Sequence, residues 1–197
     1  MKCDKKDLLL YGVTDRSWLG ERTLYSAVEQ SILGGVTMVQ LREKDLAQEE
    51  FQKEARQIQE LCKKHQVPFL INDNVELAVG IEADGVHVGQ HDMEAGQVRQ
   101  KIGPDKILGI SANTVDAAVA AEQAGADYIG AGAVFSTTTK ADAGSLTLAR
   151  LRAICDAVDL PIVAIGGISE QNILQLRGTG VDGVAVISAL FSQEEKA

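Results

Sequence analysis

The chain has 197 residues, of which 45% are hydrophobic, so it is long enough for one well-filled core and too short for two ordinary domains. Its formal net charge of −9 argues against nucleic acid and anionic membrane surfaces as partners, because the long-range field repels both. Any anionic small-molecule substrate must therefore be held by a local cluster of cationic side chains. The widely spaced Cys3, Cys62 and Cys155, together with a charged N-terminus, predict a cytoplasmic protein with reduced thiols, no signal peptide and no membrane span.

Short apolar runs rich in Val, Ile and Leu alternate with longer amphipathic stretches. This alternation is typical of buried parallel strands that are separated by surface helices. The runs cover residues 8–13, 36–41, 68–71, 85–88, 107–110, 128–131, 162–165 and 183–187. They predict eight strands.

An internal repeat supports a closed arrangement of these strands. Asp84, Asp127 and Asp182 each stand directly before a run, which indicates a repeating unit of two strands and two helices over about 40 to 55 residues. Four such units predict an α/β fold, a single (βα)8 TIM barrel over residues 1–197, with a short last helix beginning near Ser188. The alternative, an open flavodoxin-like sheet of five strands, leaves three of the runs unassigned.

In such a barrel the active site forms at the carboxyl ends of the strands, so polar residues that follow a run are candidates. Arg42 and Lys44 are two apart on an emerging strand and point to the same side, where they can grip a phosphate group. Asp73 and Asp92 end neighbouring strands, so their carboxylates can converge on one Mg2+ that also binds substrate phosphates. Solvated rim charges are the alternative for the first pair, and helix N-caps are the alternative for the second.

A second anion site is expected in the loops after the seventh and eighth runs. Gly166-Gly167 and Ile187-Ser188 occupy these loops, where barrels often bind a phosphate through backbone N–H groups. A turn that needs glycine for its backbone conformation is the alternative for the first pair.

The segment 131–146 is long for a connection between a strand and a helix. It carries Thr137, Thr138, Thr139 and Lys140, so we interpret it as a mobile lid that closes over anionic substrates. An ordinary solvated polar loop is the alternative.

Histidine chemistry is not expected to carry the function. His87 and His91 lie on a strand end and its loop rather than on one helix face, so we do not predict a zinc pair and place His87 in the barrel interior. The sequence also contains no nucleophilic Ser/His/Asp pattern and no phosphate-binding P-loop motif. Phosphates and Mg2+ remain the expected ligands.

Taken in order along the chain, several segments resemble those of the thiamine phosphate synthase family (thiamine-phosphate pyrophosphorylase). They are residues 11–15, 40–44, 71–74, 83–90 with Asp92, 137–140, 164–168 and 186–188. Each segment is a weak signal alone, but together they cover nearly the whole chain in the same order and at compatible spacing.

The resemblance implies a transferase that condenses an aminopyrimidine methyl diphosphate with a thiazole ethyl phosphate, or its carboxylated form, to thiamine phosphate and pyrophosphate with Mg2+. The implied ligands of the pyrimidine diphosphate are Gln40, Leu41, Arg42, Glu43, Lys44, Asn72, Ser111 and Lys140. The implied ligands of the thiazole phosphate are Thr137, Thr138, Thr139, Gly167, Ile187 and Ser188. Mg2+ is assigned to Asp73 and Asp92, and catalysis to Arg42, Lys44, Ser111 and Lys140.

Two departures from the family pattern bear on these expectations. The chain ends soon after Phe191, which puts closure of the outer helical ring in doubt, and Ser136 stands where the family often has Pro, which is expected to loosen the lid without loss of activity. The partners implied are phosphorylated small molecules, and a homo-oligomer is compatible with the sequence.

Two rival functions remain open from the residues. A thiazole tautomerase of the same fold resembles the chain but depends on a His after the fifth strand, where this chain has Ser111-Ala112-Asn113. A barrel that binds phosphorylated ligands without catalysis is the other rival. The pair Asp73 and Asp92 favours an enzyme, because a pure binder needs no metal carboxylates.

Overall fold

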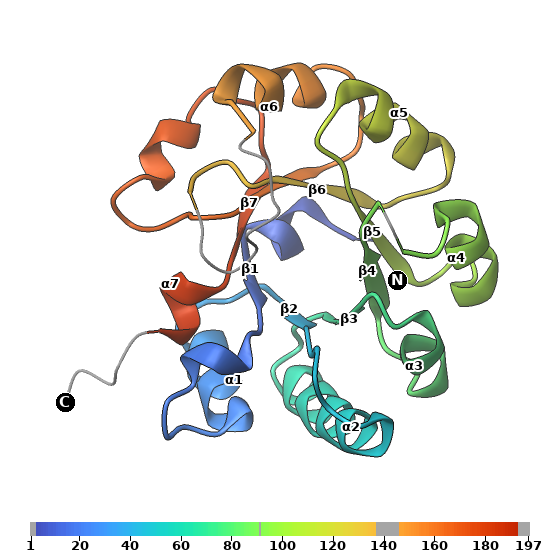
Figure 1. The fold of residues 1–197 in the computed structure, drawn as a ribbon, viewed down its shortest axis with the longest axis vertical. Coiled ribbons are helices and arrows are strands. Elements are labelled where there is room, and N and C mark those ends of the chain that lie inside the picture. Colours follow the sequence, from blue (N-terminus) through green and yellow to red (C-terminus); the bar gives the residue numbers. More distant parts are fainter. Residues whose placement is uncertain (1–2, 91, 137–145, 193–197) are drawn as a thin grey trace.

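Parallel strands close into one barrel in chain order from β1 to β8, with β8 pairing back onto β1 (Figure 1). The computed structural model describes residues 3–90, 92–136 and 146–192. The strands are β1 Leu10–Val13, β2 Met38–Leu41, β3 Phe69–Asn72, β4 Gly85–Val88, β5 Ile107–Ser111, β6 Tyr128–Gly132, β7 Ile162–Ile165 and β8 Gly183–Val186. The predicted (βα)8 barrel is confirmed, and every predicted run overlaps a strand whose ends differ from the prediction by at most two residues.

Helices surround the barrel on its outside, as Figure 1 shows. The α-helices are α1 Leu24–Leu33, α2 Gln48–Lys64, α3 Val75–Gly80, α4 Ala95–Ile102, α5 Val115–Gln123, α6 Leu148–Cys155 and α7 Ser188–Phe191. The 3₁₀ helices are η1 Lys5–Leu8, η2 Arg16–Trp18 and η3 Ile173–Leu176. Within the described ranges, no helix combines the length and the apolar character that crossing a bilayer requires.

The connection between β7 and β8 differs from the expected alternation. The described chain forms only the short η3 there instead of an α-helix. Gly178 and Gly180 follow it with φ angles of +77° and +94°, a left-handed backbone that an α-helix cannot continue through.

Side chains of each strand alternate between two apolar layers, as the pleat requires. The outward set, which includes Val39 and Ile71, packs between the barrel and the helices. The inward set fills the barrel itself with Tyr11, Met38 and Tyr128 among others. The barrel interior is therefore a packed core, and only its mouth is open to a ligand.

The repeated aspartates fasten strands together at their amino ends. Asp84 accepts a hydrogen bond from the backbone N–H of Phe69 at 2.9 Å, and Asp182 accepts one from Ile162 at 3.0 Å. Asp127 does the same for Leu108 at 2.8 Å. The aspartates of the sequence repeat thus make the same hydrogen bond at three places. Each stands directly before β4, β6 or β8 and fixes that strand beside the preceding one.

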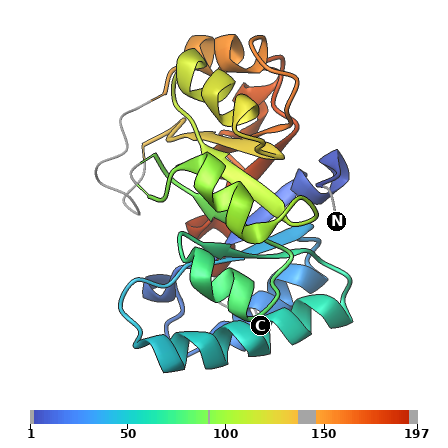
Figure 2. The same cartoon turned by 90° about the vertical axis from the view of Figure 1, so that its right-hand side faces the viewer.

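The first and the last described helices pack against the rest of the structure. The helix η1 lies at the end of the barrel away from the loop that carries η2 (Figure 2), and its Leu8 is buried against the interior cluster. The helix α7 is short, as predicted, but its Phe191 is buried and the Phe191 carbonyl accepts a hydrogen bond from Arg22. In the described residues α7 is thus docked beside the segment that leads into α1.

Candidate active site at the carboxyl ends of the strands

A cavity of about 370 Å³ opens between the loops that follow β1 and β2. Its lining combines three cationic side chains with carboxylates and apolar groups. The lining residues are Asp15, Arg16, Ser17, Trp18, Arg42, Glu43, Lys44, Asp45 and Leu46. The predicted cationic pair Arg42 and Lys44 therefore borders a real hollow at the barrel mouth.

Arg42 is held in place by the loop after β1. Its backbone N–H donates to the Thr14 hydroxyl at 2.9 Å, and the same hydroxyl donates back to the Arg42 carbonyl at 3.3 Å. Its Nη1 donates to the Asp15 carboxylate at 3.3 Å, with the Arg42 side chain only 15% exposed. A free rim charge is not held in this way, so the structure contradicts the solvated-rim alternative for Arg42. Lys44 is exposed, as that alternative expects.

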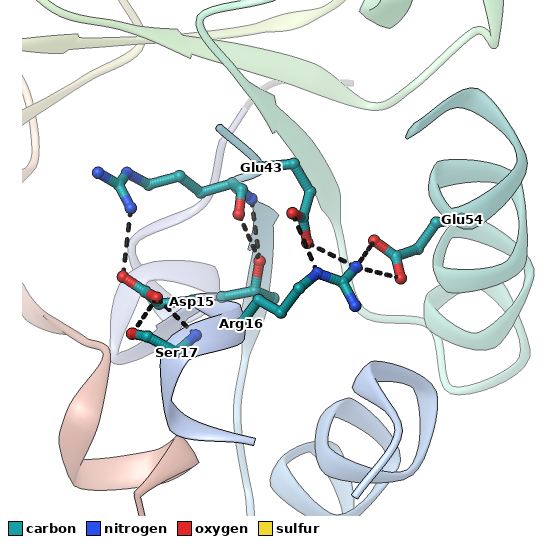
Figure 3. A network of polar contacts seen from close by, with 7 residues as sticks. Asp15, Arg16, Ser17, Glu43 and Glu54 are labelled. Atoms are coloured by element: carbon teal, nitrogen blue, oxygen red, sulfur yellow. Dashed lines mark hydrogen bonds and ion pairs between the residues drawn. The ribbon is translucent and has the colours of Figure 1, made fainter. Parts of the chain in front are cut away.

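Glu43 turns toward the protein. Figure 3 shows Arg16 lying between Glu43 and Glu54, and Arg16 Nη2 lies 3.1 Å from Glu43 and 2.7 Å from Glu54. Burial raises the pKa of the Glu43 carboxyl, and the Arg16 guanidinium partly offsets this by favouring the charged form. The Glu43 side chain thus fastens the loop between β2 and α2 to η2, and Arg16 of η2 is bonded in turn to α2.

Gln40 and Leu41, on β2, point to opposite layers. The Gln40 side chain lies inside the barrel, where its Nε2 donates to the Tyr11 hydroxyl at 2.6 Å. Leu41 is fully buried in the layer between the barrel and the helices. Any contact of Leu41 with a ligand would have to come from its backbone.

The two predicted metal carboxylates follow adjacent strands. Asp73 comes directly after β3 with a left-handed φ of +60°, and its N–H donates to the His87 carbonyl of β4 at 2.8 Å. Asp92 lies in the loop after β4 and accepts a hydrogen bond from the Gly89 N–H at 2.6 Å. The N-cap residues of α3 and α4 are Asn74 and Glu94, so the capping alternative for Asp73 and Asp92 was wrong.

These carboxylates suit a hard cation in kind and number. In the part of the chain that the structure describes, no group of three or more His, Cys, Asp or Glu side chains is arranged to hold a metal. Two carboxylates still fit Mg2+, which usually takes one or two protein oxygens and completes its shell with water and substrate phosphates.

Further polar groups stand at the ends of β3 and β5. Asn72 is half-buried as the last residue of β3, and Ser111 is the last residue of β5. The Ser111 hydroxyl lies 2.9 Å from Nε2 of His87, and the Ser111 carbonyl accepts a hydrogen bond from the Gln90 side chain. His87 lies in the barrel interior, as predicted, and its ring contacts the Ser111 hydroxyl.

Gly167 needs to be glycine for reasons of space and conformation. Its φ is +64°, and a Cβ there would overlap the Ser136 carbonyl oxygen. Gly166 is similar, with a φ of +98° and the Ala133 side chain in the way. The conformational alternative for this pair therefore holds, and it does not oppose a phosphate beside the same turn. Ile187 and Ser188 stand half-buried where β8 leads into α7.

The predicted lid residues Thr137, Thr138, Thr139 and Lys140 lie outside the described residues, as does His91. Where the chain is described on either side, the Leu146 N–H donates to the Ala133 carbonyl at 2.7 Å. This bond brings the two ends of the predicted lid segment together at the barrel mouth.

Sequence reasoning missed four side chains that support the site. Thr14 and Asp15 were part of a matching segment but carried no assigned role, and both hold Arg42. Tyr11 and Tyr128 looked like ordinary core aromatics, yet their hydroxyl groups lie 2.8 Å apart inside the barrel. A polar hydroxyl within an otherwise apolar strand was the available signal.

Comparisons with known proteins agree with one another. The sequence profile of the family described as thiamine monophosphate synthase matches residues 10–190. A thiamine-phosphate synthase of Clostridium tetani is 48% identical over 96% of this chain and 90% of its own length, and one of Ruminiclostridium cellulolyticum is 48% identical over 97% and 91%.

The fold comparison gives the same family. The solved structure of a thiamine phosphate pyrophosphorylase from Pyrococcus furiosus superposes with a TM-score of 0.89, at 37% identity over 97% of this chain and 91% of that one. Because the profile and these relatives all span nearly the whole chain, this protein belongs to the thiamine monophosphate synthase family.

Proposed function

We propose that this chain joins an aminopyrimidine methyl diphosphate to a thiazole ethyl phosphate, giving thiamine phosphate and pyrophosphate. The single observation that carries the proposal is family membership over residues 10–190. The geometry supports it, because cationic side chains, two carboxylates and a hydroxyl follow β2 to β5 at the same end of the barrel. They are Arg42, Lys44, Asp73, Asp92 and Ser111.

Arg42 and Lys44 would bind the diphosphate. The bond to Asp15 uses one N–H of Arg42, and a guanidinium carries five, so the others can fork onto phosphate oxygens without loss of the Asp15 contact. Lys44, exposed at the cavity edge, adds a point charge that can follow the diphosphate as it departs. Lys140 is proposed to add a third cation.

Asp73 and Asp92 would hold the Mg2+, which when bound neutralises charge on the diphosphate oxygens. Asp92 can turn to this role by giving up its hydrogen bond from the Gly89 N–H, and Asp73 already stands at the strand end. Asn72, Gln40 and Ser111 would orient the pyrimidine. Leu41 and Glu43 are proposed to contribute through their backbone and by fixing the loop.

The chemistry needs little covalent participation from the protein. The bond between the pyrimidine methylene carbon and the diphosphate oxygen breaks, and its electron pair leaves with pyrophosphate. The lone pair of the thiazole nitrogen then forms the new C–N bond. That nitrogen carries no proton, so no general base is required. The cationic side chains would stabilise the departing pyrophosphate, and each such contact in a site that excludes water lowers the activation free energy by about 3 kcal/mol.

The second substrate would be positioned on the other side of the mouth. Gly167, Ile187 and Ser188, with Thr137, Thr138 and Thr139, are proposed to bind the thiazole phosphate. Holding both reactants in one geometry lowers the barrier by several kcal/mol, because it removes the entropic cost of bringing them together.

The test is a reconstitution with purified protein. Both substrates and Mg2+ are supplied, and thiamine phosphate and pyrophosphate are quantified by chromatography, with EDTA added in a parallel reaction. Formation of both products in equal amounts, abolished by EDTA and restored by excess Mg2+, is the expected result. Tight binding of the thiazole phosphate without turnover would instead indicate a binding protein, and isomerisation of a thiazole carboxylate phosphate would indicate a tautomerase.

A further inference from the structure

A line of hydrogen bonds crosses the interior of the barrel from β2 to β5. Gln40 Nε2 lies 2.6 Å from the Tyr11 hydroxyl, which lies 2.8 Å from the Tyr128 hydroxyl. The Tyr128 hydroxyl lies 2.8 Å from His87 Nδ1, and His87 Nε2 lies 2.9 Å from the Ser111 hydroxyl. We call these five side chains the relay. Its two ends are residues predicted to contact the pyrimidine, and no contact with a substrate was predicted for the three side chains between them.

The packing around the relay keeps space for it. His87, Gly109 and Tyr128 stand side by side in the registers of β4, β5 and β6. A Cβ on Gly109 would overlap the Tyr128 hydroxyl and lie 2.5 Å from His87 Nδ1, and a Cβ on Gly130 would lie 3.0 Å from His87 Cε1. Neither glycine has a positive φ, so space for the two rings is the reason that these positions hold glycine.

The direction of the relay follows from the orientation of the Gln40 amide, which presents Nε2 to Tyr11, and from counting protons. Gln40 Nε2 donates to Tyr11, so the single proton of Tyr11 must go to Tyr128, since a buried hydroxyl proton without an acceptor is costly. Tyr128, now an acceptor from Tyr11, places its own proton on His87 Nδ1. With Nδ1 as acceptor, His87 carries its proton on Nε2 and donates to Ser111.

The two phenols can sustain this order because they stay protonated. Desolvation raises the pKa of both Tyr11 and Tyr128 well above the usual range of a phenol. Their rings also meet edge to face at a centroid distance of 5.8 Å, which fixes the geometry of the hydroxyl pair.

We propose that Tyr11 and Tyr128 are positioning residues that couple the hydrogen-bonding roles of Gln40 and Ser111. The relay leaves the Ser111 hydroxyl as a donor toward the mouth and keeps Gln40 Oε1 for accepting. The site therefore selects a pyrimidine with a ring-nitrogen acceptor beside an amino donor, and disfavours one in which an oxo group and a ring N–H reverse that pattern. This inference rests on the proposed function for its substrate, but the state of the relay does not.

The state of the relay can be measured without turnover. The chain has three histidines, so nitrogen NMR of the uniformly labelled protein, with His87→Gln to assign the signals, reports the His87 tautomer directly. We expect the proton on Nε2 in the wild type, and a shift of both ring-nitrogen signals in Tyr128→Phe. A proton on Nδ1 in the wild type would overturn the proposed direction, whether or not the protein makes thiamine phosphate.

The selectivity is measured with two pyrimidine diphosphates, the amino compound and its oxo analogue. In the wild type we expect kcat/KM to favour the amino compound by at least about tenfold, the value of one well-made hydrogen bond. In Tyr11→Phe we expect this preference to shrink to about threefold, with the KM for the thiazole phosphate unchanged. If the substitution only disturbed the packing of the site, kcat/KM would fall by the same factor for both pyrimidines.

The matched control is Tyr25→Phe, since Tyr25 is an exposed tyrosine of α1 away from the relay. It should keep the wild-type preference. An unchanged preference in a folded Tyr11→Phe protein would refute the coupling. If Tyr11→Phe does not fold, Tyr128→Phe is measured by the same two-substrate comparison. If the wild type makes no product with either pyrimidine, the proposed function fails while the tautomer measurement still decides the relay.

Discussion

Asp15, in the loop after β1, accepts a hydrogen bond from Nη1 of Arg42, in the loop after β2, over 3.3 Å. The pair is largely shielded from solvent, and Thr14 holds the Arg42 backbone beside it. Asp15→Asn should therefore let the guanidinium move without removing it. We expect the KM for the pyrimidine diphosphate to rise about fivefold, or about 1 kcal/mol, with a smaller change in kcat.

Steady-state kinetics with each substrate varied in turn checks this expectation. Asp159→Ala is a suitable control, because Asp159 is an exposed carboxylate before β7, at the opposite end of the barrel. A KM for the pyrimidine diphosphate that stays at the wild-type value would show that Asp15 does not position Arg42 for binding.

Asp73→Ala tests the metal assignment. Loss of one of two carboxylates should raise the Mg2+ concentration needed for half-maximal activity and lower the rate at saturating substrate by about a hundredfold, or about 3 kcal/mol. Titration of activity with Mg2+ in the variant, in Asp92→Ala and in Asp159→Ala separates metal binding from a general effect of charge. Wild-type turnover and metal dependence in Asp73→Ala would remove Asp73 from the site.

Arg16→Gln should destabilise the protein in a way that depends on pH. Burial raises the pKa of Glu43, so its ionised form is penalised in the folded state, and Arg16 is what favours that form. Removal of Arg16 raises the pKa further. The loss of stability should be largest at about pH 8, where Glu43 is charged, and small at about pH 4, where Glu43 gains a proton.

Thermal unfolding of Arg16→Gln at several pH values provides the measurement. Arg150→Gln changes the same residue type on the exposed surface of α6 and should show no such trend. Equal destabilisation of Arg16→Gln at both ends of the range would mean that the guanidinium acts by packing and not by charge.

Asp84→Ala tests the fastening of the strand ends. The Phe69 N–H would lose its acceptor in a buried part of the sheet, at a cost of about 1 to 3 kcal/mol. Urea unfolding should register this loss, while KM values for both substrates stay near those of the wild type. A variant of unchanged stability would show that the Asp84 carboxylate is dispensable.

Gly109→Ala should damage the relay from one side. The added methyl group would overlap the Tyr128 hydroxyl, so the rings must shift, at a cost of about 1 to 3 kcal/mol in stability. We expect weaker use of the pyrimidine diphosphate and unchanged affinity for the thiazole phosphate, as measured by calorimetry. Gly80→Ala, at a glycine with open space around it, is the control.

The barrel itself could be predicted because its strands are nearly continuous apolar runs, which few other structures require. The run at 162–165 matches β7 at both ends, and the aspartate repeat marks the amino ends of three strands. The short η3 could not be anticipated, since the apolar residues Ile173 and Leu174 suggest a longer helix. The chain leaves the helical conformation at Arg177, and Gly178 and Gly180 then adopt a left-handed backbone, which glycine permits but does not demand.

The candidate site could be predicted in outline and not in its connections. Polar residues after each strand identify Arg42, Asp73 and Ser111 as candidates, because strand ends meet at one edge of a barrel. Which side chains become hydrogen-bond partners depends on the register between the strands. Tyr11 and Tyr128 are 117 positions apart, and only the closure of the barrel brings their hydroxyls together.

The aspartates that begin β4, β6 and β8 lie at one end of the barrel, and the ligand-facing groups lie at the other. Asp84, Asp127 and Asp182 bond backbone N–H groups of β3, β5 and β7, whereas Arg42 and Asp92 bond loop residues at the other end. Substitutions at the two ends should therefore have free-energy effects that add. The stability lost through a substitution at the carboxyl ends of the strands can therefore be offset by a stabilising substitution at their amino ends. The same separation would let natural variants explore new substrates while the closed sheet keeps them folded.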